Sequence, residues 1–415
     1  MEVAIMKYET LRKLYYSSKE EYLSEYQNRI NLNSTIKFDF NIGENQAFFV
    51  QTQEVIDLLS KILRLDKKIL SIKSGLPKIA IRQFSNRCLI DEIILTNRIE
   101  GVQSTRKEIS EVLDDLEEKI TLNNKKKRFN GMILRYLRLS NNIDLILDTC
   151  TDMRKLYDEI VLQEVIDEEP KHYPDGELFR KELSSVHTVT GKIIHNGVYP
   201  EEKIKESIMK AITFLKDDSI ESLYRISIFH YLIEYIHPFY DGNGRLGRYI
   251  LSDFLSKELD PLIAYRISYT ILDNIKEYYQ AFEECNDSHN LGDVTPFLIM
   301  MLTMIHTSMA RLSGALESRK IKFDRYKKVI AILPCRPQRN ADEFYYLLLQ
   351  ASLFSEKGIT TKELEKYLKS SYGTIKKDID FLKEKGLLIT QNEGRKLFYQ
   401  FDLKKFDNIY LSEKE

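Results

Sequence analysis

Glycine and proline are scarce in this sequence, at 16 and 9 of its 415 residues. Because these residues interrupt helices and form turns, their scarcity beside abundant Leu, Ile, Lys and Glu predicts an all-α fold in which strands are few and short. Hydrophobic residues make up 43% and charged residues 30% of the chain, which excludes wholesale disorder. At about 150 residues per domain, the length predicts two or three domains.

The sequence also has few cysteines, almost no net charge and no long apolar run. The four cysteines (Cys88, Cys150, Cys285 and Cys335) lack the CxxC or Cys/His spacing of metal ligands, so we expect reduced thiols in a cytoplasmic protein. A formal charge of -1 argues against a protein that covers nucleic acid or an anionic membrane with its whole surface. The N-terminus lacks the pattern of a signal peptide, and the most apolar run, residues 297–305, has about half the length of a membrane-spanning helix.

Two boundaries divide the sequence into three regions. The first is a polar stretch at residues 123–128, and the second is marked by Pro334 and Pro337. In the first region, hydrophobic periodicity predicts helices over residues 52–72 and about 84–101. We therefore expect an N-terminal helical region, a helical central domain and a smaller C-terminal domain, at residues 1–125, 126–325 and 335–415.

Strands are expected at two places. Between residues 177 and 200, several β-branched residues precede the turn dipeptide Asn196-Gly197, which predicts a short hairpin. In the C-terminal domain, helices that begin at Thr361 and Tyr372 precede two apolar runs on either side of residues 392–394, and this order resembles a winged helix. Residues 355–405 carry twelve basic and eight acidic side chains, so the local charge is +4.

One segment of the central domain carries most of the chemistry. Residues 237–248 read His-Pro-Phe-Tyr-Asp-Gly-Asn-Gly-Arg-Leu-Gly-Arg and follow a helix rich in apolar residues. Gly242 and Gly244 let backbone N–H groups converge just before the next helix, and converging N–H groups form an anion site. Arg245 and Arg248 add guanidinium groups that bind phosphate oxygens, so the segment predicts a polyphosphate site.

Two further residues of this segment indicate the reaction. Asp241 would be repelled by bound phosphates unless a cation lay between them, and Mg²⁺ is the usual ion. His237 is the candidate base, because an unperturbed histidine has a pKa of about 6.5, which suits a general base at neutral pH. A base, a magnesium ligand and an anion site together predict attack on a phosphate of a nucleotide.

The segment resembles the signature of the Fic family, His-Pro-Phe-x-Asp-Gly-Asn-Gly-Arg-x-x-Arg, at every fixed position. The resemblance implies a helical Fic core with a hairpin flap, and transfer of AMP from ATP to a Ser, Thr or Tyr hydroxyl of a protein. It also implies that His237 deprotonates the hydroxyl, that Asp241 holds Mg²⁺ and that Arg248 binds the γ-phosphate. The remaining phosphate contacts would come from Gly242, Asn243, Gly244 and Arg245.

The resemblance extends to both sides of the signature. Residues 177–180 and the expected hairpin resemble the flap, which holds the target segment by strand addition. Downstream, Tyr279 and Asn286 lie in a stretch that resembles the one closing over adenine; the alternative is that they are ordinary core and capping residues. His230 lies seven residues before His237, and a packed histidine is favoured there over a metal ligand.

The helix expected to end near residue 101 resembles another part of the family. Its last residues, Thr96-Asn97-Arg98-Ile99-Glu100-Gly101, are similar to the inhibitory motif Ser/Thr-x-x-x-Glu-Gly. Packed against the anion site, Glu100 would pair with Arg248 in the place of the γ-phosphate, and ATP could bind only in a pose unsuited to in-line attack. The same glutamate could instead position a water that removes AMP from a modified protein.

Functions of two classes therefore stay open. The first is an autoinhibited protein adenylyltransferase that uses ATP and Mg²⁺, with de-AMPylation at the same site as its variant. The second is a nucleotide-sensing regulator that binds DNA through the winged helix. Intact His237 and Asp241 favour the enzyme, because a sensor would not need a base. The expected partners are a hydroxyl-bearing protein, which could be the enzyme itself, and either DNA or a second copy in a homodimer, but no membrane.

Overall fold

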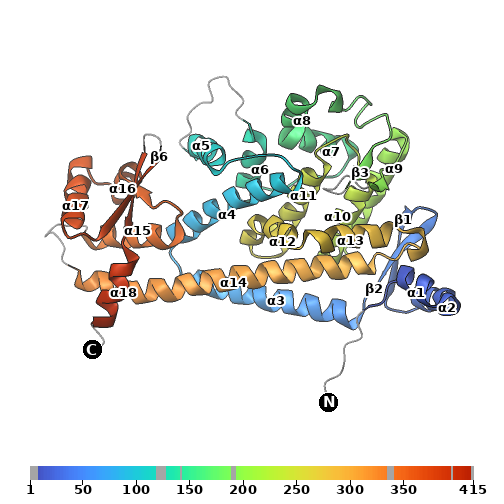
Figure 1. Ribbon diagram of the computed structural model, residues 1–415, viewed down its shortest axis with the longest axis horizontal. Helices are drawn as coiled ribbons and strands as arrows, with labels where there is room; N and C mark the ends of the chain where they lie inside the picture. The colour runs from blue at the N-terminus through green and yellow to red at the C-terminus, as the bar shows by residue number, and fades with distance from the viewer. Residues whose placement is uncertain are drawn as a thin grey trace, which may run out of the picture. The chain divides into compact units, whose positions relative to one another are not determined.

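The computed structural model describes residues 8–117, 128–140, 143–187, 193–333, 341–393 and 396–412 (Figure 1). Helices dominate this part of the chain, and its strands form only small antiparallel sheets, as the all-α expectation requires. The described residues group into two compact units, one from residues 1–66 and 89–310 and the other from residues 67–88 and 311–415. Residues 123–127, Pro334, Cys335 and Pro337, which carry the predicted boundaries and one cysteine, lie outside the described residues.

The chain begins with two helices and a hairpin, followed by longer helices. The elements up to residue 140 are α1 (Leu11–Ser17), α2 (Lys19–Ile30), β1 (Thr35–Ile42), β2 (Asn45–Val50), α3 (Gln53–Ser74), α4 (Lys78–Ile99), α5 (Arg106–Glu117) and α6 (Asn130–Ser140). The two predicted helices of this region are thus α3 and α4, although α4 begins about a turn and a half earlier than expected. Gly101, the second residue after α4, has a φ of 74°, so the predicted C-terminal glycine is confirmed.

The central elements include one helix, α10, that is buried on nearly all sides. They are α7 (Cys150–Tyr157), α8 (Gln163–Glu168), β3 (Ser185–His187), β4 (Ile193–Asn196), α9 (Glu201–Leu215), α10 (Ser222–Ile236), α11 (Asn243–Glu258), α12 (Ile267–Asp273), α13 (Ile275–Asn286) and α14 (Thr295–Ile332). Helix α10 packs against both α9 and α11 and buries nearly every side chain, which is typical of a helix at the centre of a core. Its end at residue 236 places His237 at a fixed point of that core.

The predicted hairpin of the central domain is confirmed, but its turn lies elsewhere. β3 and β4 pair antiparallel, with Ser185 opposite Asn196 and Val186 opposite His195. Asn196 therefore ends β4, and Asn196-Gly197 does not form the hairpin turn. The connection itself, residues 188–192, lies outside the described residues.

The second unit contains the elements predicted near the C-terminus in their predicted order. They are α15 (Ala341–Phe354), β5 (Ile359–Thr360), α16 (Thr361–Leu368), α17 (Tyr372–Glu384), β6 (Leu388–Glu393), β7 (Lys396–Phe401) and α18 (Leu403–Ser412). Helix α16 begins with a capping box between Thr360 and Glu363, which explains why the start of this helix could be predicted. The sheet order is β5-β7-β6, and α15, β5 and α18 were not predicted. Within the described residues, no helix combines the length and apolarity needed to cross a membrane.

Candidate active site

A cavity of about 170 Å³ lies where α10, α11 and α13 meet the end of α4 and the hairpin β3–β4. It gathers nearly all the site residues predicted from the sequence, namely Glu100, His237, Asp241, Gly242, Asn243, Gly244, Arg248, Tyr279 and Asn286. Arg245 is not among its lining residues. The volume is below the roughly 300 Å³ at which ligand pockets usually begin, and the side chain of Glu100 forms part of its wall.

His237 is held at the cavity by an unusual backbone conformation. The residue caps α10 with a φ of 51°, in the left-handed region that side chains rarely adopt. Arg180, which is fully buried, donates hydrogen bonds from Nε to the His237 carbonyl oxygen (2.9 Å) and from Nη2 to that of Val198 (2.8 Å). A Cβ atom on Gly197 would lie 2.9 Å from the Cβ of His237, so only glycine allows this close approach. Arg180 and Gly197 thus fix the position of the His237 backbone and Cβ, from which the imidazole extends.

The predicted anion site lies at the N-terminus of α11, which begins at Asn243. Gly242 is its N-cap with a φ of 80°, and no side chain caps the first turn. The side chain of Asn243 forms two hydrogen bonds with the backbone of Phe239, of 2.9 Å and 2.8 Å, and so stabilises the turn. Asn243 can therefore contribute its backbone N–H to an anion, together with the other first-turn amides.

Asp241 and Arg245 are linked behind this turn. Asp241 Oδ1 accepts a hydrogen bond from the Gly242 N–H (2.5 Å) and lies 3.9 Å from Arg245 Nη2. Arg245 is fully buried, and its Nη1 lies 3.3 Å from Glu164 Oε2. Arg245 lies beside these two carboxylates and is not among the residues that line the cavity, so its contact with a phosphate stays a prediction.

Arg248 receives three contacts from the end of α4. Its Nη2 lies 2.7 Å from Glu100 Oε1, and it also donates to the Thr96 hydroxyl from Nε (2.8 Å) and to the Thr96 carbonyl from Nη2 (3.0 Å). A Cβ on Gly244 would lie 2.2 Å from Glu100 Oε1, so the carboxylate occupies space directly over the first turn of α11. Both polar residues of the Thr-x-x-x-Glu pattern thus contact the same guanidinium.

The α13 side of the cavity is aromatic and ends at Asn286. Burial, together with the charge of Glu100, raises the pKa of Tyr279 to about 12, so this phenol is neutral. Asn286 Oδ1 accepts a hydrogen bond of 2.6 Å from the hydroxyl of Tyr231. His230 is buried and lies 2.7 Å from the Tyr278 hydroxyl, and burial lowers the pKa of its imidazole to about 3. It is a packed, neutral histidine, as the sequence favoured.

Glu234 is a cavity residue that sequence reasoning missed. It lines the cavity one turn before His237, and its Oε1 atom has no hydrogen-bond partner among the described residues. Burial raises the pKa of this carboxyl to about 8, and Glu100 adds to the rise. The signal was a single acidic residue in a helix made mostly of apolar residues. His195 of β4 was missed as well, and burial lowers the pKa of its imidazole to about 4.

Comparison with known proteins identifies the class to which this site belongs. Residues 149–255 match the model of the Fic/DOC family. The complete twelve-residue signature lies inside that match, so residues 149–255 carry a Fic domain.

Particular relatives are similar over a limited part of their length. The chain is 26% identical over 180 residues to the protein adenylyltransferase fic-1 of Caenorhabditis elegans, and equally to that of Caenorhabditis briggsae. Each match covers 41% of this chain but only 32% of the relative. Solved structures that are similar include a Fic family protein from Desulfovibrio desulfuricans G20, with 17% identity, a TM-score of 0.48 and coverage of 84% of this chain and 96% of the other. Fic-1 from C. elegans has 18% identity, a TM-score of 0.44 and coverage of 74% and 81%.

Proposed function

We propose that this protein is an adenylyltransferase that moves AMP from ATP to a Ser, Thr or Tyr hydroxyl of a protein. The observation that carries the proposal is that one cavity contains His237, the N-terminus of α11 and Arg248. A base, an anion site and a cation are the groups that nucleotidyl transfer requires. The adenylyltransferase activity named for the two nematode relatives agrees with this chemistry.

The reaction follows from these positions. His237 takes the proton of the protein hydroxyl, whose oxygen then forms a bond to the α-phosphorus of ATP. The bond from that phosphorus to the bridging oxygen of the β-phosphate breaks, and pyrophosphate leaves with the electron pair. The first-turn amides of α11 stabilise the negative charge that develops on the α-phosphate, since they are fixed in place before the reaction.

Mg²⁺ is the cation that fits Asp241. This carboxylate lies on the cavity wall and is 37% exposed, so it can reach an ion shared with a nucleotide. No group of three or more His, Cys, Asp or Glu in the described ranges could hold a metal by itself. Mg²⁺ bound by one carboxylate takes its other ligands from phosphates and water, and it would neutralise charge on the α- and β-phosphates.

The proposal includes inhibition by Glu100. Arg248 would bind the γ-phosphate, but the carboxylate that lies 2.7 Å from Nη2 occupies that place. A triphosphate must then displace Glu100 or bind out of line with the attacking hydroxyl, and transfer depends on alignment. Adenylyl transfer should therefore be slow until the end of α4 moves.

Labelled ATP tests both parts of the proposal. The full-length wild type, Glu100→Gly and Glu100→Gly/His237→Ala are incubated with ATP labelled on the α-phosphate and Mg²⁺, and label on the protein itself is followed. We expect strong labelling for the single variant only, and mass spectrometry should then find AMP on a hydroxyl side chain. Equal labelling of the wild type and Glu100→Gly would contradict inhibition by Glu100. No labelling of either protein would contradict the proposed transferase activity.

De-AMPylation uses the same residues in the reverse sense, and the same experiment separates it. Labelled Glu100→Gly protein is freed of ATP and mixed with unlabelled wild type. Loss of label that requires Glu100 would show that this glutamate positions a water. Stable label would leave transfer as the reaction.

The C-terminal unit supports a second candidate function, ATP-sensing regulation through DNA. Lys376 and Lys377 of α17 are exposed; of its acidic residues, which could repel phosphates, Asp378 is only 5% exposed and Asp380 is half-buried, while Glu384 is exposed. The exposed Tyr372 and Thr374 lie at the N-terminal end of the same helix, where a winged helix would read base edges. A gel-shift titration over increasing salt tests this. DNA binding lost in Lys376→Ala/Lys377→Ala but kept in Lys366→Ala would support it, and no binding at low salt would end it.

A further inference from the structure

The last turn of α13 connects the cavity to the N-terminal segment, residues 8–30. Asn286 lines the cavity as the last residue of α13, and the residues around it contact α1. Arg12 Nε lies 3.0 Å from Asp287 Oδ2, and Arg12 Nη1 lies 3.4 Å from Glu284 Oε2. Thr10 also donates a hydrogen bond to Glu284. The N-terminal segment thus holds residues on both sides of Asn286.

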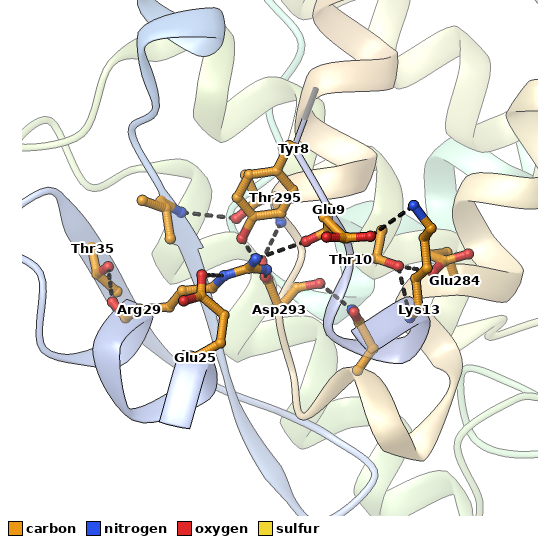
Figure 2. Close-up of polar contacts among 12 residues, drawn as sticks. Tyr8, Glu9, Thr10, Lys13, Glu25, Arg29, Thr35, Glu284, Asp293 and Thr295 are labelled. Atoms are coloured by element: carbon orange, nitrogen blue, oxygen red, sulfur yellow. Dashed lines mark hydrogen bonds and ion pairs between the residues drawn. The ribbon is translucent and has the colours of Figure 1, made fainter. Parts of the chain in front are cut away.

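The N-terminal segment is attached a second time at Asp293, near the other end of the loop of residues 287–294 that follows α13. Asp293 is fully buried, and its Oδ2 accepts hydrogen bonds from the Tyr8 hydroxyl (2.5 Å) and from Arg29 Nη1 (3.3 Å), as Figure 2 shows. Arg29 also donates from Nη2 to the Glu9 carbonyl oxygen at 2.7 Å. A buried carboxylate is costly unless it is paired and hydrogen-bonded. The loop from residue 287 to 294 is thus held by the N-terminal segment through Asp293, in addition to its backbone hydrogen bonds with Phe48 of β2.

Between these two attachments the rings of Tyr15 and His289 lie 3.8 Å apart, and His289 Nδ1 lies 2.8 Å from Asp287 Oδ1. On its other side, Asn286 is held by the Tyr231 hydroxyl of α10, the helix that carries His237. The Asn286 amide thus has one support from the catalytic core and another from residues 8–30. The family match begins at residue 149, so the second support lies outside it.

We infer that the N-terminal segment positions Asn286 and so sets the affinity of the cavity for its nucleotide. The inference rests on the proposed function and on the role that the family resemblance implies for Asn286, contact with the adenine of ATP. Arg12 is the positioning residue, because it bridges Glu284 and Asp287 while remaining 33% exposed itself. Removal of the Arg12 side chain should free the end of α13 without disturbing His237. The substitution should therefore weaken nucleotide binding and leave the chemical step unchanged.

The test compares Arg12→Ala with Lys13→Ala, both in full-length Glu100→Gly protein. Lys13 is the next residue of α1, is 70% exposed and pairs with Glu9, not with α13. We expect Arg12→Ala to raise the Kd for ATP and the KM about tenfold, the size of a lost hydrogen bond between charged groups, with kcat within about twofold. Lys13→Ala should match the parent. An ATP affinity of the Arg12→Ala variant equal to that of the Glu100→Gly parent would overturn the inference.

A double-variant cycle shows whether Arg12 acts through Asn286. In an Asn286→Ala background, Arg12→Ala should cause no further loss of ATP affinity, since the positioned amide is absent. Additive losses would overturn the inference. Hydrogen exchange of residues 284–295 tests the positioning by the N-terminal segment independently of the proposed adenylyl transfer. Faster exchange in Arg12→Ala than in Lys13→Ala supports the positioning even if no AMP is transferred, and equal exchange overturns it.

Discussion

Glu100 Oε1 lies 2.7 Å from Nη2 of Arg248, an arginine that is only 1% exposed. The two residues are far apart in the sequence, and the pair depends on α4 ending at residue 99, with Glu100 directly after it. Thr96, one turn earlier, supplies two more oxygens to the same guanidinium. Inhibition would therefore depend on the whole end of this helix and not on one carboxylate.

Thr96→Ala should release part of the inhibition. The substitution removes the hydroxyl that accepts from Arg248 Nε, and a hydrogen bond to a charged group contributes about 1.5–3 kcal/mol. We expect self-labelling with ATP to rise several-fold, but less than in Glu100→Gly. Thr96→Ser keeps the hydroxyl and should behave as the wild type. Equal labelling of both Thr96 variants would mean that this hydroxyl does not hold α4.

Gly197→Ala should impair the chemical step. The added Cβ would lie 2.4 Å from Arg180 Nη2, 2.9 Å from the Cβ of His237 and 3.0 Å from the Ile236 carbonyl oxygen. Because the base must be aligned with the hydroxyl, we expect kcat in a Glu100→Gly background to fall at least about tenfold, with the Kd for ATP within about threefold. Gly314→Ala is the control, since its Cβ meets no atom within 4 Å. A normal kcat for Gly197→Ala would show that His237 tolerates displacement.

Glu164→Ala should destabilise the protein through Arg245. The variant leaves this fully buried guanidinium without its closest carboxylate, and breaking a buried pair costs about 3–5 kcal/mol. Glu168→Ala, on the same helix, removes only an exposed pair with Arg128 and should cost at most about 1 kcal/mol. Urea unfolding of both variants measures the difference. Similar losses would indicate that Arg245 finds another partner, Asp241 being the nearest at 3.9 Å.

The sequence predicted those features that depend on local pattern. Helix α10 lies directly before residue 237, where it was predicted, because an apolar run is followed there by Pro238. The hairpin β1–β2 was missed although Ile36, Phe38, Phe40 and Ile42 alternate with polar residues, so the signal for a strand was present. The orientation of the Arg245 side chain could not be predicted, because it depends on a contact with Glu164, which lies 81 residues earlier in the chain.

Glu234→Gln should stabilise the protein increasingly as pH rises. Burial holds the pKa of Glu234 at about 8 in the folded chain, against 4.5 for an ordinary glutamate. Between these values the folded state binds the proton and the unfolded state does not, so stability falls with rising pH and is fully reduced above about 8. Glutamine is neutral throughout and removes this part of the dependence.

Melting temperatures at pH 5, 6, 7 and 8 would measure the effect. The difference between Glu234→Gln and the wild type should be smallest at pH 5 and grow in favour of the variant up to pH 8. Glu206→Gln, at an exposed position of α9, should show no such growth. Burial also raises the pKa of the Glu92 and Glu164 carboxyls to about 7, so both add to the pH dependence of stability. Both are present in every protein compared, so their effect cancels in the difference. A constant difference across this range would mean that Glu234 is ionised in the folded protein and that Arg248 then faces two charged carboxylates.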